Sequence, residues 1–260
     1  MAEAQSRQRS LRILVLNPNS STSMTNGMAA AIRKLPLSDS VEISTYTAPP
    51  SVPGSIDGQQ DIDDSAKAVL DDADLTRDLE SDKYDAVLVA CFSVHPLVAQ
   101  LGKYQHLAVT GIFEASITTA LSLSPAPLNG EKWAIVTTGK FWEDHLADGV
   151  KDFFGQSSAT DNSKFAGVYS TGLLAGDFHS ISAEDIRAKL EAATTKIFAS
   201  GNVSRVVLGC GGMAGLEDAI RTTAIAVYGK AKGEQVYIID GVKAGVLQLE
   251  QTIRSKRAFR

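Results

Sequence analysis

Three landmarks of this chain occur twice, in the same order and at nearly the same spacing. The pairs are "LRILVLNPNS" (11–20) with "KWAIVTTGKF" (132–141), "YDAVLVACFS" (84–93) with "SRVVLGCGGM" (204–213), and "AVTGIFEAS" (108–116) with "YIIDGVKAG" (237–245). An ordered repeat of this kind indicates a duplicated structural unit. The sequence therefore predicts two similar halves related by a pseudo-two-fold axis.

Short apolar runs alternate with longer segments that carry apolar residues at helical spacing. Near-continuous apolar strands separated by helices are typical of buried parallel strands joined by βαβ crossovers. The predicted fold class is therefore α/β, with one parallel sheet in each half. Strands are expected at 11–16, 41–47, 85–90, 107–112, 132–138, 165–170, 205–209 and 235–240. Helices are expected at 24–35, 61–80, 182–200 and 214–229.

The composition narrows the classes of partner and compartment. The 260 residues are 44% hydrophobic and 21% charged, with a net charge of −5, which is typical of a soluble globular protein and argues against nucleic acid or an anionic membrane as partner. No apolar run reaches the roughly 18–20 residues of a membrane span. The first residues, 1–10, carry no apolar core of a secretory signal and are expected to form a disordered tail. Two cysteines are no disulfide framework, so we expect free thiols in the cytoplasm.

The two cysteines stand at matching places of the repeat. Cys91 and Cys210 each follow an expected strand, and ligands of open parallel sheets bind beyond the carboxyl ends of the strands. If the halves face each other, the two thiols face each other across the cleft. Ser93 offers a hydroxyl beside Cys91, and Gly211 and Gly212 leave backbone N–H groups open to an anionic atom. A nearby helix N-terminus is expected to favour the thiolates.

Two opposed thiols suit a reaction in which one removes a proton from a carbon and the other returns a proton to the opposite face. This is two-base racemisation, and it needs hydrogen-bond donors that stabilise the intermediate enolate. Other interpretations of the cysteines are a small buried hydrophobic residue and a zinc ligand, although no C-x-x-C or H-x-x-x-H spacing accompanies them. "GCGGMA" (209–214) also fits a dinucleotide fingerprint, with Asp240 as its acidic residue.

The ordered set of motifs resembles the hydantoin/allantoin racemases of the aspartate/glutamate racemase superfamily, over nearly the whole chain after residue 10. The stretches that carry the resemblance are "LNPNSS" (16–21), "GSIDG" (54–58), "ACFS" (90–93), "GIFEA" (111–115), "AIVTT" (134–138), "LGCGGM" (208–213) and "IDGV" (239–242).

The resemblance implies a cofactor-independent, metal-free isomerase with two Rossmann-like domains, which commonly forms homo-oligomers. One domain would hold 11–111 plus the last helix, 241–260, and the other 112–240. The implied substrates are 5-substituted hydantoins or allantoin, and the implied acid/base pair is Cys91 and Cys210. The implied substrate-binding residues are Asn17, Ser93, Thr137, Thr138, Gly211, Gly212 and Glu114.

One segment departs from the family pattern. After "CFS" the chain reads "VHPL", which places His95 four residues after Cys91, where an imidazole could modulate the thiol. "SVPGSID" (51–57) is expected to form a flap over the site. The alternatives within the superfamily are a maleate isomerase, a malonate decarboxylase and an amino-acid racemase. Outside it, the alternative is a non-catalytic two-lobed protein that binds a small molecule.

Overall fold

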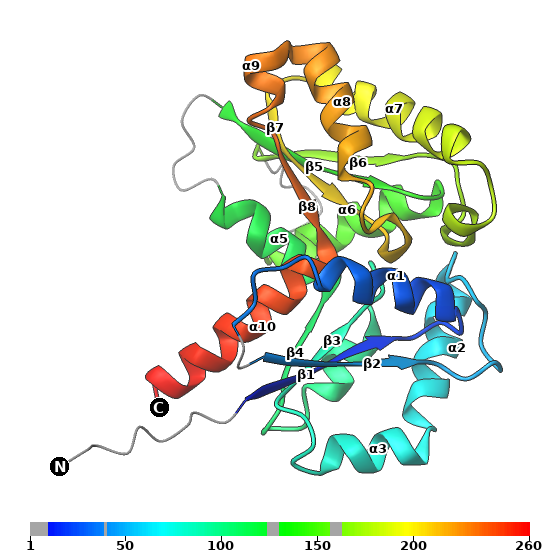
Figure 1. Cartoon of the computed structure of the whole chain (residues 1–260), viewed down its shortest axis with the longest axis vertical. Helices are drawn as coiled ribbons and strands as arrows, with labels where there is room; N and C mark the ends of the chain where they lie inside the picture. Colours follow the sequence, from blue (N-terminus) through cyan, green and yellow to red (C-terminus); the bar gives the residue numbers. More distant parts are fainter. Residues whose placement is uncertain (1–9, 39–40, 124–129, 157–162) are drawn as a thin grey trace.

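The chain folds into two four-stranded parallel sheets of the same strand order, each with helices around it (Figure 1). The computed structural model describes residues 10–38, 41–123, 130–156 and 163–260, so the expected tail lies outside the described residues except for Ser10. The first sheet has the order β2 (Val41–Thr47), β1 (Leu11–Asn17), β3 (Ala86–Val89) and β4 (Ala108–Gly111). The second has the order β6 (Phe165–Ser170), β5 (Lys132–Thr137), β7 (Val203–Leu208) and β8 (Tyr237–Asp240).

All eight expected strands are present, and the two-halved α/β class is confirmed. The central strands are apolar and buried on both faces; all four residues of β3 are buried. In each sheet the strand order reverses between the first and third strands, β1 and β3 or β5 and β7. Loops at the carboxyl ends of such a pair diverge and leave room for a ligand.

The helices connect the strands and cover the sheets. They are α1 (Thr22–Ile32), α2 (Gln59–Leu70), α3 (Ala73–Glu80), α4 (Pro96–Leu101), α5 (Ile112–Ser122), α6 (Phe141–Phe153), α7 (Ala183–Ala199), α8 (Glu217–Tyr228), α9 (Lys230–Gly233) and α10 (Gly241–Ala258). Two short 3₁₀ helices are η2 (Ala175–His179) and η3 (Gly211–Met213). The helix expected at 182–200 is confirmed, with Ser182 as its N-cap.

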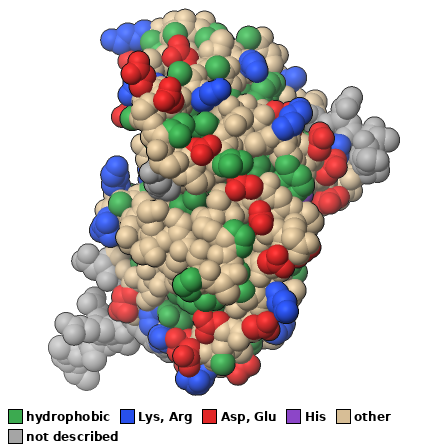
Figure 2. All heavy atoms as spheres, turned by 90° about the vertical axis from the view of Figure 1, so that its right-hand side faces the viewer, with side chains coloured by type: hydrophobic (Ala, Val, Ile, Leu, Met, Phe, Trp, Pro, Cys, Tyr) green, Lys and Arg blue, Asp and Glu red, His purple; other side chains and the backbone are tan. Residues whose placement is uncertain are grey.

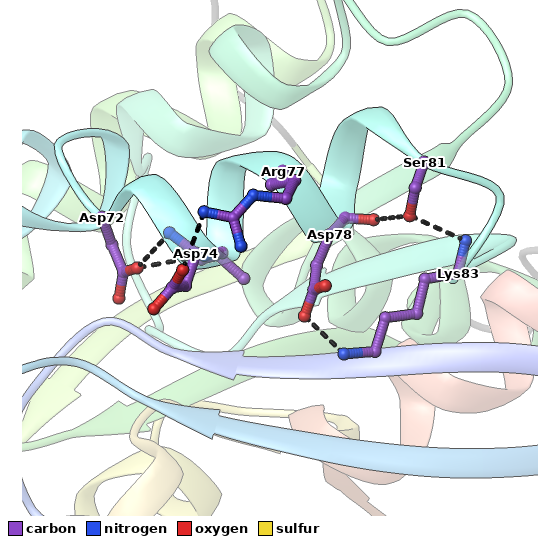
Figure 3. Close-up of polar contacts among 7 residues, drawn as sticks. Asp72, Asp74, Arg77, Asp78, Ser81 and Lys83 are labelled. Atoms are coloured by element: carbon purple, nitrogen blue, oxygen red, sulfur yellow. Dashed lines mark hydrogen bonds and ion pairs between the residues drawn. The ribbon is translucent and has the colours of Figure 1, made fainter.

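The single helix expected over 61–80 is wrong, because two helices occupy that segment. The Asp72 carboxylate accepts hydrogen bonds from the backbone N–H groups of Asp74 and Leu75 and so starts a new helix. Figure 3 shows this cap together with the ion pairs Arg77–Asp74 and Lys83–Asp78 along the outer face of α3. These side chains are solvated, so this acidic and basic row belongs to the surface and not to the cleft.

The expected helix at 214–229 begins later, at Glu217. Gly215 has a φ of 91°, a left-handed conformation that interrupts a right-handed helix. The short 3₁₀ helix η3 stands before it, directly after Cys210. The helices α4, α5, α6 and α9 were not among those predicted. In α5 the polar stripe of Glu114, Thr118 and Ser122 is narrow, and most other positions are buried, so the helical period is weakly marked in the sequence.

Two helices link the halves. α5 follows β4 of the first sheet but contacts β7 and β8 of the second, whereas α10 follows β8 and contacts β3 and β4 of the first (Figure 1). A Cβ at Gly245 of α10 would lie 2.3 Å from a Leu88 methyl carbon, so any side chain there would force the buried Leu88 side chain to move. We propose on this packing that the structural units are 11–111 plus 241–260, and 112–240.

The outer surface carries charges of both signs. On the face shown in Figure 2, Lys and Arg side chains are interspersed with Asp and Glu, and hydrophobic side chains gather near mid-height. No helix among the described residues has both the length and the apolarity needed to cross a bilayer.

Candidate functional site

A narrow cavity lies between the halves, at the carboxyl ends of the central strands of both sheets. Its volume is about 30 Å³, so the cleft leaves little free space between the halves in this structure. Of the ten predicted site residues, six line it: Asn17, Cys91, Thr138, Cys210, Gly211 and Gly212. The other four, Ser93, Glu114, Thr137 and His95, lie behind this lining.

Cys91 and Cys210 hold equivalent positions. Each follows the third strand of its sheet after one intervening residue, and each is a free thiol that is partly exposed. Ser93 Oγ donates to Cys91 Sγ at 3.4 Å, and the Gly212 backbone N–H donates to Cys210 Sγ at 3.3 Å. The repeat in the sequence thus brings one thiol from each half to one cavity, and each sulfur accepts a hydrogen bond.

The surroundings of both sulfurs favour the neutral thiol. Desolvation raises the pKa of Cys91 to about 12, with further contributions from Cys210, Asp57 and Glu114, while the Ser93 hydrogen bond acts in the opposite direction. Desolvation likewise raises the pKa of Cys210 to about 11, against the hydrogen bond from Gly212. Neither thiol has the lowered pKa expected from a helix terminus: only the three-residue η3 follows Cys210, and α4 begins at Pro96, five residues after Cys91. A thiolate formed here is correspondingly a strong base.

The turn that carries Cys210 packs closely against the backbone of β5 and is hydrogen-bonded to one threonine. Thr137 Oγ1 donates to the Gly209 carbonyl at 2.9 Å, so Thr137 positions the turn and does not face the cavity. A Cβ at Gly209 would lie 2.7 Å from the Val136 carbonyl oxygen, which restricts the position to glycine. Thr138, the next residue, lines the cavity itself.

Glu114 lies near Cys91 without lining the cavity. It occupies the first turn of α5, where burial raises the pKa of its carboxyl, and its Oε2 is buried without a hydrogen-bond partner. Glu114 acts on Cys91 electrostatically, because its charge contributes to the raised pKa of that thiol. The structure thus places it behind the thiol, within electrostatic range and out of reach of a ligand in the cavity.

His95 is held by other partners than Cys91. Its Nδ1 accepts from the Leu97 backbone N–H at 3.3 Å and caps α4, and its Nε2 lies 3.2 Å from Ser65 Oγ on α2. Desolvation lowers its pKa to about 4, so the ring is neutral at neutral pH. It can therefore supply no positive charge to a thiolate there.

Several residues that line the cavity were not predicted. Asn19 stands in the same "NPNS" turn as Asn17, so the motif itself carried the signal. Of the others, Ala90 and Gly209 directly precede the two cysteines. The remaining residues form an apolar wall that only their hydrophobicity marks in the sequence: Met24, Met28, Ile56, Phe92, Trp142 and Ala175. The flap, residues 51–57, supplies Ile56 to this wall, and its Asp57 contacts the opposite half.

The arrangement does not suit the other ligands weighed from the sequence. In the part of the chain that the structure describes, no group of three metal-ligating side chains is found. Asp240, the acidic residue of the dinucleotide pattern, is buried and accepts hydrogen bonds from Val242 and Lys243 as the N-cap of α10. Its Oδ1 is thus occupied within the protein and its Oδ2 lies 3.8 Å from Lys243 Nζ. Only the three-residue η3 follows the glycine turn.

Comparison with known families agrees with this geometry. The family described as Asp/Glu/Hydantoin racemase matches residues 13–249. The chain belongs to the Asp/Glu/Hydantoin racemase family. The resemblance read from the motifs is therefore confirmed.

Similar proteins of this family cover nearly the whole chain. An uncharacterized protein of Schizosaccharomyces pombe is 34% identical over 94% of this chain and 92% of its own. The hydantoin racemase of Pseudomonas sp. (strain NS671) is 26% identical over 91% and 83%. Among solved structures, allantoin racemase from Klebsiella pneumoniae has a TM-score of 0.74 and 26% identity, covering 95% of this chain and 89% of its own.

Membership in a racemase family gives the paired thiols a chemical context. Two groups that exchange protons with one carbon must reach it from opposite faces, and here one thiol comes from each half of the molecule. Each sulfur has a hydrogen-bond donor of the kind that stabilises a thiolate.

Proposed function

We propose that this racemase-family protein inverts the C5 centre of a 5-substituted hydantoin or of allantoin, without a cofactor, and that Cys91 and Cys210 are its acid/base pair. One observation carries the proposal. Two thiols from equivalent positions line one narrow cavity between the halves, and no Asp, Glu, Lys, Arg or His side chain of the described residues lines it with them. A neutral ring with one acidic C–H bond matches such a lining.

The proton transfers balance over one turnover. The thiolate on one side takes the C5 proton, so that an S–H bond forms, a C–H bond breaks, and the electron pair moves onto the adjacent carbonyl as an enolate. The thiol on the other side then gives its proton to the opposite face of C5 and becomes the thiolate. The pair ends with its protonation reversed, ready for the mirror-image substrate.

The raised thiol pKa values fit this chemistry. A thiolate in water is a weak base toward a carbon acid, and desolvation in the cavity strengthens it. The cost is a small thiolate population at neutral pH. We therefore expect kcat/KM to rise with pH across the neutral and mildly alkaline range.

The lining argues against the related reactions. A free amino acid brings an ammonium group that needs a carboxylate partner, and the acid beside the cavity, Asp57, already accepts hydrogen bonds from Ser55 and Ala175. Maleate and malonate are dianions, for which the described lining offers no cationic side chain. A binding protein would have no use for paired thiols.

Loss of optical activity is the primary test. Enantiomerically pure allantoin and a 5-alkylhydantoin are each followed by circular dichroism with the protein after dialysis against a chelator. We expect the signal of at least one compound to decay faster than the uncatalysed rate, and added metal or pyridoxal phosphate to leave that decay unchanged. No decay with either compound would refute the proposed function.

Single-cysteine variants test the two-base mechanism. Cys91→Ser and Cys210→Ser should each lower racemisation by about 10²–10⁴-fold. In D₂O, each variant should still exchange the C5 hydrogen of one enantiomer, the opposite one in the two variants, without inversion, as read by proton NMR. If one variant exchanges both enantiomers equally, a single cysteine serves both faces and the two-base proposal fails.

A further inference from the structure

The "NPNS" turn contains two asparagines that both line the cavity. Asn17 is the last residue of β1, and Asn19 follows two residues later, before α1. Both are buried. Their hydrogen bonds differ, and the difference decides which of the two amides can reach a ligand.

The amide of Asn17 is used within the protein. Its Oδ1 accepts from the Asn19 backbone N–H at 3.2 Å. Its Nδ2 donates to Asn19 Oδ1 at 2.9 Å and to Thr25 Oγ1 at 3.0 Å. Asn17 therefore fixes the shape of the turn, and both ends of its amide are occupied.

The amide of Asn19 is held in one orientation, and its donor end has only a weak acceptor among the described residues. Its Oδ1 accepts from the Ser21 backbone N–H at 2.9 Å and from Asn17 Nδ2. These two donors require an oxygen at that position, so the Nδ2 group must occupy the other one. Among the described residues, the acceptor that Nδ2 meets is the Met24 thioether sulfur at 3.3 Å, which is a weak one.

We infer that Asn19 Nδ2 is a substrate donor: it gives a hydrogen bond to the carbonyl oxygen beside the reacting carbon and holds the charge that develops there. The inference rests on the proposed function, because the enolate of that reaction places negative charge on this oxygen. A buried donor whose orientation is fixed in advance needs no reorganisation as the charge forms. Asn17 is the positioning residue that keeps the Asn19 amide in place.

Two substitutions of Asn19 distinguish its structural role in the turn from its role as a hydrogen-bond donor to the substrate. Asn19→Asp keeps an oxygen for Ser21 and Asn17 and replaces the N–H donor by an acceptor. Asn19→Ala removes both. If Asn19 serves only the turn, Asn19→Asp should behave like the wild type and Asn19→Ala should be the worse variant in stability and in activity.

If Asn19 donates to the substrate, the two variants should rank differently in thermal stability and in kcat/KM. We expect Asn19→Asp to unfold thermally close to the wild type and Asn19→Ala to unfold at a lower temperature. We expect kcat/KM to fall by at least about tenfold in both, and in Asn19→Asp by at least as much as in Asn19→Ala. A kcat/KM within threefold of the wild type in Asn19→Asp would overturn the inference.

The carboxylate of Asn19→Asp could also slow the reaction by changing the ionisation of the thiols. Calorimetric binding of unsubstituted hydantoin avoids this effect, because binding involves no proton transfer to or from a thiol. The ring is uncharged, so loss of the donor should weaken its binding in both variants. Unchanged binding would count against the inference, as would a wild type that does not bind hydantoin.

The cysteine variants and the wild-type rate, measured in the racemisation assay, report on the proposed function. A wild type without racemase activity refutes that function, and the binding comparison still decides the role of Asn19.

Discussion

The carboxylate of Asp57, in the flap of the first half, accepts a hydrogen bond from the Ala175 backbone N–H of the second half at 3.2 Å. Ser55 Oγ donates to the other oxygen at 2.5 Å, and the Asp57 N–H donates to Asp61. Both Ile56 and Ala175 line the cavity, so this bond joins the halves where the cavity closes. The same carboxylate raises the pKa of both thiols.

Two substitutions of Asp57 should distinguish the effect of its charge on the thiols from the effect of its hydrogen bond to Ala175. Asp57→Asn keeps an oxygen for the Ala175 N–H and removes the negative charge, so the pH at which iodoacetamide alkylates Cys91 and Cys210 should shift downward for both. Asp57→Ala also removes the bond between the halves. In that variant alkylation should be faster at every pH, because the cleft opens more often. Peptide mass spectrometry resolves the two sites, and equal behaviour of the variants would contradict a role in closure.

The thiols should make the protein less stable at alkaline pH. Their pKa values in the folded protein, about 12 and about 11, exceed the ordinary value of 9.0, so between these limits the folded state binds more protons than the unfolded state. The free energy of unfolding must then fall as pH rises above 9. Each of Cys91→Ser and Cys210→Ser should reduce this slope by up to about 1.4 kcal/mol per pH unit, measured by urea unfolding. A slope equal to the wild type in both variants would show that the thiols ionise freely.

The strands and the positions of the two thiols could be predicted from the sequence, but the contacts between the halves around the site could not. Apolar runs fixed the eight strands, and the repeat placed both cysteines at strand ends. Neither signal could pair Asp57 with Ala175, which lie 118 residues apart, because that bond exists only when the halves meet. Nor could it tell Asn17 from Asn19, since both are turn residues and only their hydrogen bonds differ. Asp is a common N-cap residue, but the apolar spacing continues across Asp72, so the sequence pattern did not show that a second helix begins there.

His95 should make the protein sensitive to acid. Its pKa is lowered from 6.5 to about 4, so the unfolded state binds the proton first as the pH falls through this range. Stability is then lost between about pH 6.5 and pH 4, by at most about 3 kcal/mol. His95→Asn, whose amide can still cap α4, should lose less stability over that range. A steep loss that persists in His95→Asn would assign it to other groups.

The same variant tests whether His95 modulates Cys91. Because the ring is neutral at neutral pH, His95→Asn should leave the pH dependence of Cys91 alkylation unchanged. Ser65→Ala, which removes the partner of Nε2, serves as a second probe of the same ring. A shift for Cys91 but not for Cys210 would mean that the imidazole carries charge in the working enzyme.

The tight turn before Cys210 should tolerate no side chain. A Cβ at Gly209 would lie 2.7 Å from both the Val136 carbonyl oxygen and an Ile135 methyl carbon, and the strand backbone there cannot give way. Gly209→Ala should therefore lower the free energy of unfolding by about 1–3 kcal/mol and reduce racemisation, because the turn that carries the thiol must move. Gly27→Ala is the matched control, since a Cβ at that position in α1 meets nothing within 4 Å. Alanine in a helix should raise stability there by about 0.5–1 kcal/mol. If Gly209→Ala matches Gly27→Ala in urea unfolding and in activity, the close approach of the two strands does not position Cys210.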